Sequence, residues 1–87
     1  MNKNIFDFKI TGRKSFAEFI SLLREDLIKN EDGWENPTLD RFLEAMEAYT
    51  LDIDGYYKNM HIDINVDAGN PPWQVFADIL RGARVYE

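Results

Sequence analysis

A short stretch of the sequence carries oxygen-bearing side chains near the spacing of a calcium-binding loop. An EF-hand loop supplies oxygen ligands from positions 1, 3 and 5, a glycine at position 6 and a bidentate glutamate at position 12. When Gly55 is placed at position 6, position 1 is Thr50 and position 12 is His61. Neither supplies a carboxylate, so the sequence does not predict calcium binding. The Asp54-Gly55 pair is instead typical of a turn that ends a helix.

Residues that could act as nucleophiles or metal ligands are few. His61 is the single histidine and there is no cysteine, which excludes a two-histidine or thiolate zinc site and a cysteine nucleophile. Ser15 and Ser21 are the two serines, and neither lies in a G-x-S-x-G motif. The glycines are scattered singly, so no phosphate-binding loop is present. We therefore expect no enzymatic activity, no cofactor and no metal.

The charge of the chain favours protein binding. The formal net charge is −6, and residues 15–54 carry eleven acidic and three basic side chains. Nucleic acids and anionic membranes attract clustered lysine and arginine, so neither is an expected partner. A basic protein is the expected partner of an acidic domain of this kind.

Eight residues form the candidate partner-binding set. Three acidic residues recur at i, i+4 and i+7 on one face of a predicted helix, and two more follow shortly before the Asp-Gly turn. Three aromatic residues fall in predicted loops, where they either anchor a cationic partner or close over the core, and both interpretations stay open. The set is Asp40, Glu44, Glu47, Asp52, Asp54, Trp34, Tyr56 and Tyr57.

The first predicted helix covers residues 15–29. Ser15 followed by Glu18 is typical of a capping box, in which each side chain accepts a hydrogen bond from a backbone N–H at the helix start. Residues 5–10 (IFDFKI) precede the helix and alternate apolar and polar side chains, which is typical of a short strand. The helix has an apolar stripe at i, i+3, i+4, i+7 and i+11. This stripe is Phe16, Phe19, Ile20, Leu23 and Leu27.

The second predicted helix follows a loop over residues 30–37 and ends at the Asp-Gly turn. Asn36 or Thr38 is the expected cap, with Pro37 in the first turn. Apolar residues recur at spacings of three and four, which predicts an amphipathic helix. This stripe is Leu39, Phe42, Leu43, Met46 and Tyr49.

The rest of the chain predicts a third helix and a second alternating segment. Residues 61–66 (HIDINV) alternate, and they could pair with residues 5–10 as a small two-stranded sheet. Two prolines then lead into a helix from Trp73 to Val85. The predicted fold class is therefore mainly α, a single compact three-helix domain over residues 1–87, with the small sheet as an optional addition.

The expected location is the cytoplasm. No apolar run approaches the ~20 residues of a membrane span, and the N-terminus lacks the apolar stretch of a signal peptide. The absence of cysteine fits a reducing compartment. The sequence leaves open whether the domain is a monomer or a homodimer.

Four strings of residues carry a resemblance to a known group of proteins. They are WENPTL (34–39), FLEAM (42–46), DGYYKN (54–59) and the closing segment with Pro72-Trp73, Phe76-Ala77, Ile79-Leu80 and Tyr86-Glu87. From Ser15 onward the chain resembles short, acidic bacterial proteins classed as a domain of unknown function. The resemblance implies no activity. By analogy, small acidic bacterial proteins of this kind are similar to immunity proteins, which neutralise a cognate toxin domain.

These observations lead to two hypotheses about function. The first is a non-enzymatic, immunity-type protein that binds a basic toxin domain such as a nuclease, with acidic residues that steer the partner and aromatic residues that anchor it. The second is a housekeeping adaptor or structural subunit whose contact is apolar and whose acidic residues keep it soluble. Salt separates the two hypotheses, because it weakens steered association and hardly changes an apolar contact.

Overall fold

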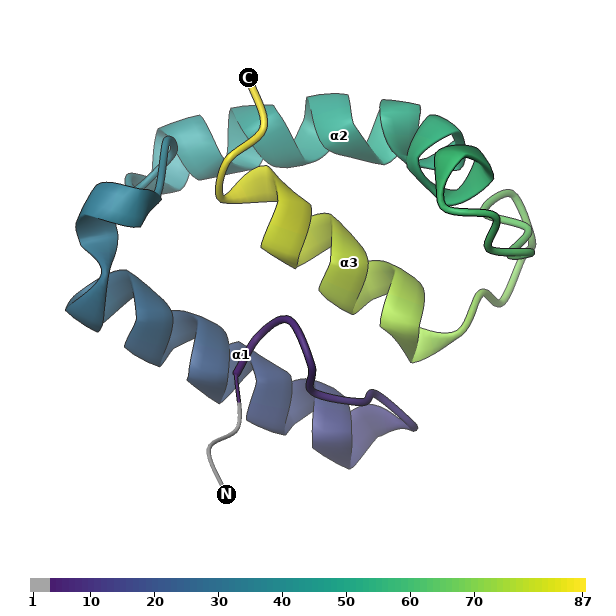
Figure 1. Ribbon diagram of the computed structural model, residues 1–87, viewed down its shortest axis with the longest axis horizontal. Helices are drawn as coiled ribbons and strands as arrows, with labels where there is room; N and C mark the ends of the chain where they lie inside the picture. The colour runs from purple at the N-terminus through teal and green to yellow at the C-terminus, as the bar shows by residue number, and fades with distance from the viewer. Residues whose placement is uncertain (1–3) are drawn as a thin grey trace.

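Three α-helices make up the computed structural model, which describes residues 4–87 (Figure 1). The mainly α, three-helix class predicted from the sequence is confirmed. A short 3-10 turn, η1, lies between the first two helices. The elements are α1 (Arg13–Lys29), η1 (Glu31–Gly33), α2 (Leu39–Asn59) and α3 (Trp73–Ala83).

The optional two-stranded sheet does not form, since residues 4–87 contain no strand. Residues 5–10 begin in a turn, in which Asn4 Oδ1 accepts hydrogen bonds from two backbone N–H groups at 2.8 and 3.0 Å. Residues 61–66 begin at His61, whose φ of 57° is left-handed and turns the chain away from the end of α2. Alternating apolar residues therefore occur in both segments without a ladder of backbone hydrogen bonds.

The first helix starts earlier than its sequence signal suggests. It begins at Arg13, and Gly12 is the N-cap. Ser15 Oγ accepts hydrogen bonds from the N–H groups of Thr11 and Gly12 at 2.8 and 3.1 Å. The prediction that Ser15 caps α1 is therefore wrong. Its hydroxyl takes the role that glutamate has in a capping box, because it reaches back from the third helical position.

The second helix is longer than predicted. Thr38 is its N-cap, and the Thr38 hydroxyl accepts a hydrogen bond from the Arg41 N–H at 3.3 Å. The prediction of a turn at Gly55 is wrong, because α2 continues through it. Glycine inside a helix costs about 0.5–1 kcal/mol relative to alanine, whereas burying a side chain such as Ile53 or Tyr57 contributes about 1.5–3 kcal/mol. Burial of these two residues on either side of Gly55 outweighs the local turn preference.

The third helix is the centre of the fold. It packs against both α1 and α2, whereas the backbones of α1 and α2 stay apart within residues 4–87, and α2 reaches the part of the core that contains α1 through the Phe42 side chain (Figure 1). The core accordingly has two parts. One part joins α1 and α3 around Phe19 and includes Ile5 and Ile10 from the N-terminal segment. The other joins α2 and α3 around Ile53 and Tyr57.

The loop before α2 caps the C-terminal end of α3. Asn36 is buried, and its Nδ2 donates to the carbonyls of Ala83 and Tyr86 at 3.0 and 2.8 Å. The Asn36 N–H donates to the Arg84 carbonyl at 3.1 Å. The last carbonyls of a helix lack partners inside it, so the bonds to Ala83 and Arg84 satisfy the end of α3 from across the fold, and the bond to Tyr86 holds the segment that follows. The helix ends here, two residues before the predicted Val85.

Candidate functional site

The outer side of α2 carries four of the five predicted acidic residues. Asp40, Glu44, Glu47 and Asp54 are all exposed. At 3.6 residues per turn they fall on the side of α2 opposite its buried residues. They extend over about 21 Å of helix at 1.5 Å per residue. We call these four residues the acidic face.

The acidic face has no ion-pair partner within residues 4–87. Ion pairs in this part of the chain join Glu25 to Lys29 at 2.9 Å and Asp78 to Arg81 at 2.9 Å. Neither involves the acidic face or the exposed Arg41 on the same helix. Exposed Lys58 lies on the same side of α2 one turn after Asp54, so the four carboxylates outnumber the basic side chains there. This excess of carboxylates produces a negative potential that attracts positive charge.

The fifth predicted acidic residue, Asp52, lies apart from the acidic face. Its carboxylate accepts a hydrogen bond from the hydroxyl of Tyr86, near the C-terminus of the chain. This hydrogen bond raises the pKa of Tyr86, and desolvation adds to it. Asp52 thus holds the C-terminal segment to α2.

Trp34 belongs to the core. It is buried, its Nε1 donates to Asp26 Oδ2 at 2.8 Å, and its ring stacks on Phe42 with a centroid distance of 5.7 Å. The prediction that Trp34 lies in a loop is confirmed, but its indole closes over the core and is not available as a surface anchor.

Tyr56 and Tyr57 lie on α2, so their predicted loop position is wrong. Tyr57 is only 2% exposed and packs between α2 and α3. Tyr56 is half-buried, with its ring centroid 5.4 Å from that of Tyr57. Of the three predicted aromatic anchors, Tyr56 alone retains exposed surface.

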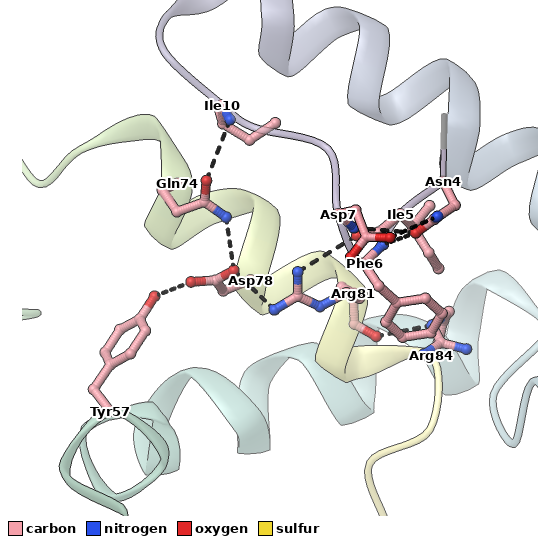
Figure 2. A network of polar contacts seen from close by, with 10 residues as sticks. All are labelled: Asn4, Ile5, Phe6, Asp7, Ile10, Tyr57, Gln74, Asp78, Arg81 and Arg84. Atoms are coloured by element: carbon pink, nitrogen blue, oxygen red, sulfur yellow. Dashed lines mark hydrogen bonds and ion pairs between the residues drawn. The ribbon is translucent and has the colours of Figure 1, made fainter. Parts of the chain in front are cut away.

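A buried polar cluster around Asp78 links the parts of the fold, as Figure 2 shows. Asp78 accepts hydrogen bonds from the Tyr57 hydroxyl at 2.5 Å, Gln74 Nε2 at 2.9 Å and Arg81 at 2.9 Å. Gln74 Oε1 in turn accepts from the Ile10 N–H at 3.3 Å. Burial and the hydrogen bond to Asp78 raise the pKa of Tyr57. We call this the Asp78 network. All of its buried polar side-chain atoms have hydrogen-bond partners, so we interpret the network as structural. The sequence pattern that could have revealed it is an aspartate between buried apolar positions of α3.

The sequence did not predict an apolar groove of about 450 Å³ between α1 and the start of α2. The predicted apolar stripe of α2 includes Leu39 and Leu43, and an amphipathic helix is expected to bury such a stripe, but these two residues are 74% and 52% exposed. Leu39 is at the edge of the groove, and Leu43 follows one turn later. The apolar stripe of α2 has more residues than the core covers. These extra apolar residues were the feature of the sequence that could have indicated the groove. The groove is lined by Ile20, Leu23, Arg24, Leu27, Trp34, Asn36, Pro37, Thr38, Leu39, Phe42 and Leu80.

Comparison with family models gives a match over residues 12–87, to a family described as Family of unknown function (DUF7660). The chain belongs to this family. Neither the curated proteins nor the solved structures gave a match.

The DUF7660 match leaves out an N-terminal segment that contributes to the core. Ile5 and Ile10 are buried, and Arg81 donates a hydrogen bond to the Ile5 carbonyl at 3.4 Å. The Arg84 guanidinium lies over the Phe6 ring, 5.1 Å from its centroid. Residues 4–11 thus cover one side of the DUF7660 helices (Figure 2).

Residues 4–87 also bear on metal sites and membrane-spanning helices. In that range, the His, Asp and Glu side chains form no group of three that could hold a metal ion. The same residues include no helix that combines the length and the apolar character needed to cross a bilayer.

Proposed function

We propose that this DUF7660 chain is a non-enzymatic protein-binding domain of the immunity type, which neutralises a basic toxin domain by covering its positive surface. A nuclease is the most specific form of such a partner, because binding a phosphate backbone requires clustered lysine and arginine. The observation that carries the proposal is the acidic face of α2, with four exposed carboxylates and no ion-pair partner in residues 4–87.

Electrostatics of this kind acts mainly on the rate of association. A field of one sign steers an oppositely charged protein and raises the on-rate by factors of about 10 to 1,000 at low salt. The net charge of −6 adds to the local field of the acidic face. Tyr56 packs against the α2–α3 part of the core, on the side of α2 away from the acidic face, so the carboxylates form this surface without an aromatic anchor.

Charge reversal on the acidic face tests the proposal. The partner is captured from native cells with the purified protein at low salt and identified by mass spectrometry, and association is then measured by stopped flow. Glu44→Lys combined with Glu47→Lys should lower the on-rate by about tenfold or more and flatten its salt dependence.

The matched control for this test changes the net charge by the same amount, at two positions outside the acidic face. Asp63→Lys combined with Asp67→Lys alters two exposed residues of the loop between α2 and α3. This variant should slow association much less. Equal effects of both variants, or none from either, would show that the acidic face does not guide a partner.

One observation favours a second candidate, the housekeeping adaptor. Leu39 and Leu43 are exposed beside an apolar groove, as expected for an apolar protein contact. An adaptor bound in this way keeps its affinity as ionic strength rises, whereas an immunity-type complex guided by charge associates more slowly.

A further inference from the structure

The central helix has an apolar side that the rest of the chain leaves open. The Asp78 network lies on the side of α3 covered by residues 4–11 (Figure 2). Trp73, Phe76 and Leu80 recur at i, i+3 and i+7 and form a stripe on nearly the opposite side of α3. Trp73 and Phe76 are 42% and 41% exposed, and Leu80 lines the groove. The stripe therefore continues the groove along α3.

The walls of this open side come from the other two helices. On α1, the Phe16 ring contacts Trp73 with a centroid distance of 5.3 Å, and Ile20 lines the groove one turn later. On α2, Leu39 and Leu43 provide exposed apolar surface. The backbones of α1 and α2 stay apart within residues 4–87, and the groove lies between them with Phe42 and Leu80 in its lining.

The two walls carry opposite charge. On α2, the acidic face begins within a third of a turn of Leu39 and Leu43. A lysine or arginine side chain can lay its apolar stem across such a strip and place its charged end at the carboxylates. On α1, the charged residue that lines the groove is Arg24. A segment with a basic edge is therefore attracted to the α2 wall and repelled by the α1 wall.

We propose that this groove binds an amphipathic α-helix of the partner, with its apolar side on the α3 stripe and its lysine- or arginine-rich edge against the acidic face. The inference rests on the proposed function, since it identifies which part of a basic partner is bound. A helix satisfies its own backbone hydrogen bonds, so it can enter an apolar groove without burying unpaired polar groups. With it in place, α3 is covered on both sides, as in a four-helix bundle.

A second copy of this chain is a poorer occupant. Each copy carries a net charge of −6, so association brings like charges together. The helices of a copy also bury their own apolar residues in the core. A partner helix with a basic edge has the complementary charge, and self-association becomes an outcome of the test.

The first test uses a synthetic peptide as the probe. It is a helical leucine and lysine peptide of about 15 residues, or four turns, with leucine along one side. Titration into the isotope-labelled protein should shift the amide NMR signals of residues 20–27, 39–43 and 73–80. A control peptide with glutamine in place of leucine keeps the charge and should bind at least about tenfold more weakly.

Variants of the protein separate the groove from the acidic face. Leu39→Ser combined with Leu43→Ser removes apolar wall from two exposed positions and should weaken peptide binding about tenfold. Ile28→Ser, an exposed position of α1 outside the groove lining, is the control and should bind normally. Glu44→Gln combined with Glu47→Gln should remove most of the salt dependence. Circular dichroism checks that each variant keeps its helices.

Three results would overturn the helix-in-groove inference. One is peptide binding that shifts only the acidic face and is unchanged by the leucine variants. Another is no binding at millimolar peptide. The third is a groove already occupied by a second copy, seen as concentration-dependent shifts without peptide. None of these three results contradicts the proposed function. The proposed function is contradicted by a different result, namely that charge reversal on the acidic face leaves association with the captured partner unchanged.

Discussion

The Tyr57 hydroxyl tests whether the Asp78 network holds α2 against α3. Tyr57→Phe removes its hydrogen bond to the buried Asp78 carboxylate and keeps the ring, so no large cavity forms. A hydrogen bond to a charged group contributes about 1.5–3 kcal/mol, and Asp78 keeps the Gln74 and Arg81 donors. We therefore expect the free energy of unfolding to fall by about 2 kcal/mol, which lowers the Tm of a domain this small by roughly 8–16 °C.

Urea unfolding followed by far-ultraviolet circular dichroism measures this loss. Tyr56→Phe is the matched control, because within residues 4–87 the hydroxyl of this neighbouring tyrosine makes no hydrogen bond. It should cost less than about 0.5 kcal/mol, as for a substitution that removes no buried interaction. If both variants lose the same free energy, or if Tyr57→Phe loses less than about 0.5 kcal/mol, the hydroxyl does not support the network as reasoned.

Two further predictions concern alkaline stability and the glycines. The pKa of Tyr57 is raised above its ordinary value of 10.0 in the folded protein, so unfolding releases a proton above that pH and stability is lost as pH rises, by up to about 1.4 kcal/mol per unit. Urea titrations between pH 9 and 11 should show this slope, and Tyr57→Phe should reduce it. Part of the slope should persist in Tyr57→Phe, because burial also raises the pKa of Tyr49. Gly82→Ala should cost about 1–3 kcal/mol, because its Cβ would lie 2.1 Å from the Tyr49 ring. Gly55→Ala meets no atom within 4 Å inside α2 and should stabilise the protein by about 0.5–1 kcal/mol in the same assay.

The helices were predictable because periodic apolar burial dominates this chain. Phe19 and Leu23 of the first predicted stripe are buried, and the third helix follows its two prolines as expected. The four residues of the acidic face were predictable for the same reason. Once a helix places its apolar residues inward, acidic residues at the complementary positions must lie outward.

The errors arise where distant contacts override local signals. The Asp-Gly pair of residues 54–55 lies inside α2 because Ile53 and Tyr57 are buried on α3. The alternation of residues 61–66 finds no partner strand among residues 4–87, and half-buried Ile64 and Val66 pack on the core from an irregular segment. The groove was hidden because periodicity says which residues share a side of a helix, and not whether another helix covers that side.

The acidic face is compatible with a stable α2. Reversing the charge of two of its residues should therefore change binding without unfolding the protein. Like charges at i, i+4, as in Asp40 and Glu44, cost about 0.2–0.5 kcal/mol, far less than the burial of Ile53 and Tyr57 contributes. In the Glu44→Lys and Glu47→Lys variant, the pair of residue 44 with Asp40 becomes attractive, its pair with Arg41 becomes repulsive, and positions 44 and 47 stay alike in sign, so these small contributions nearly cancel. The variant should therefore be as stable as the unmodified protein. A loss of association in that variant is then a loss of attraction and not of folding, and this separates a functional acidic face from a merely solvated one.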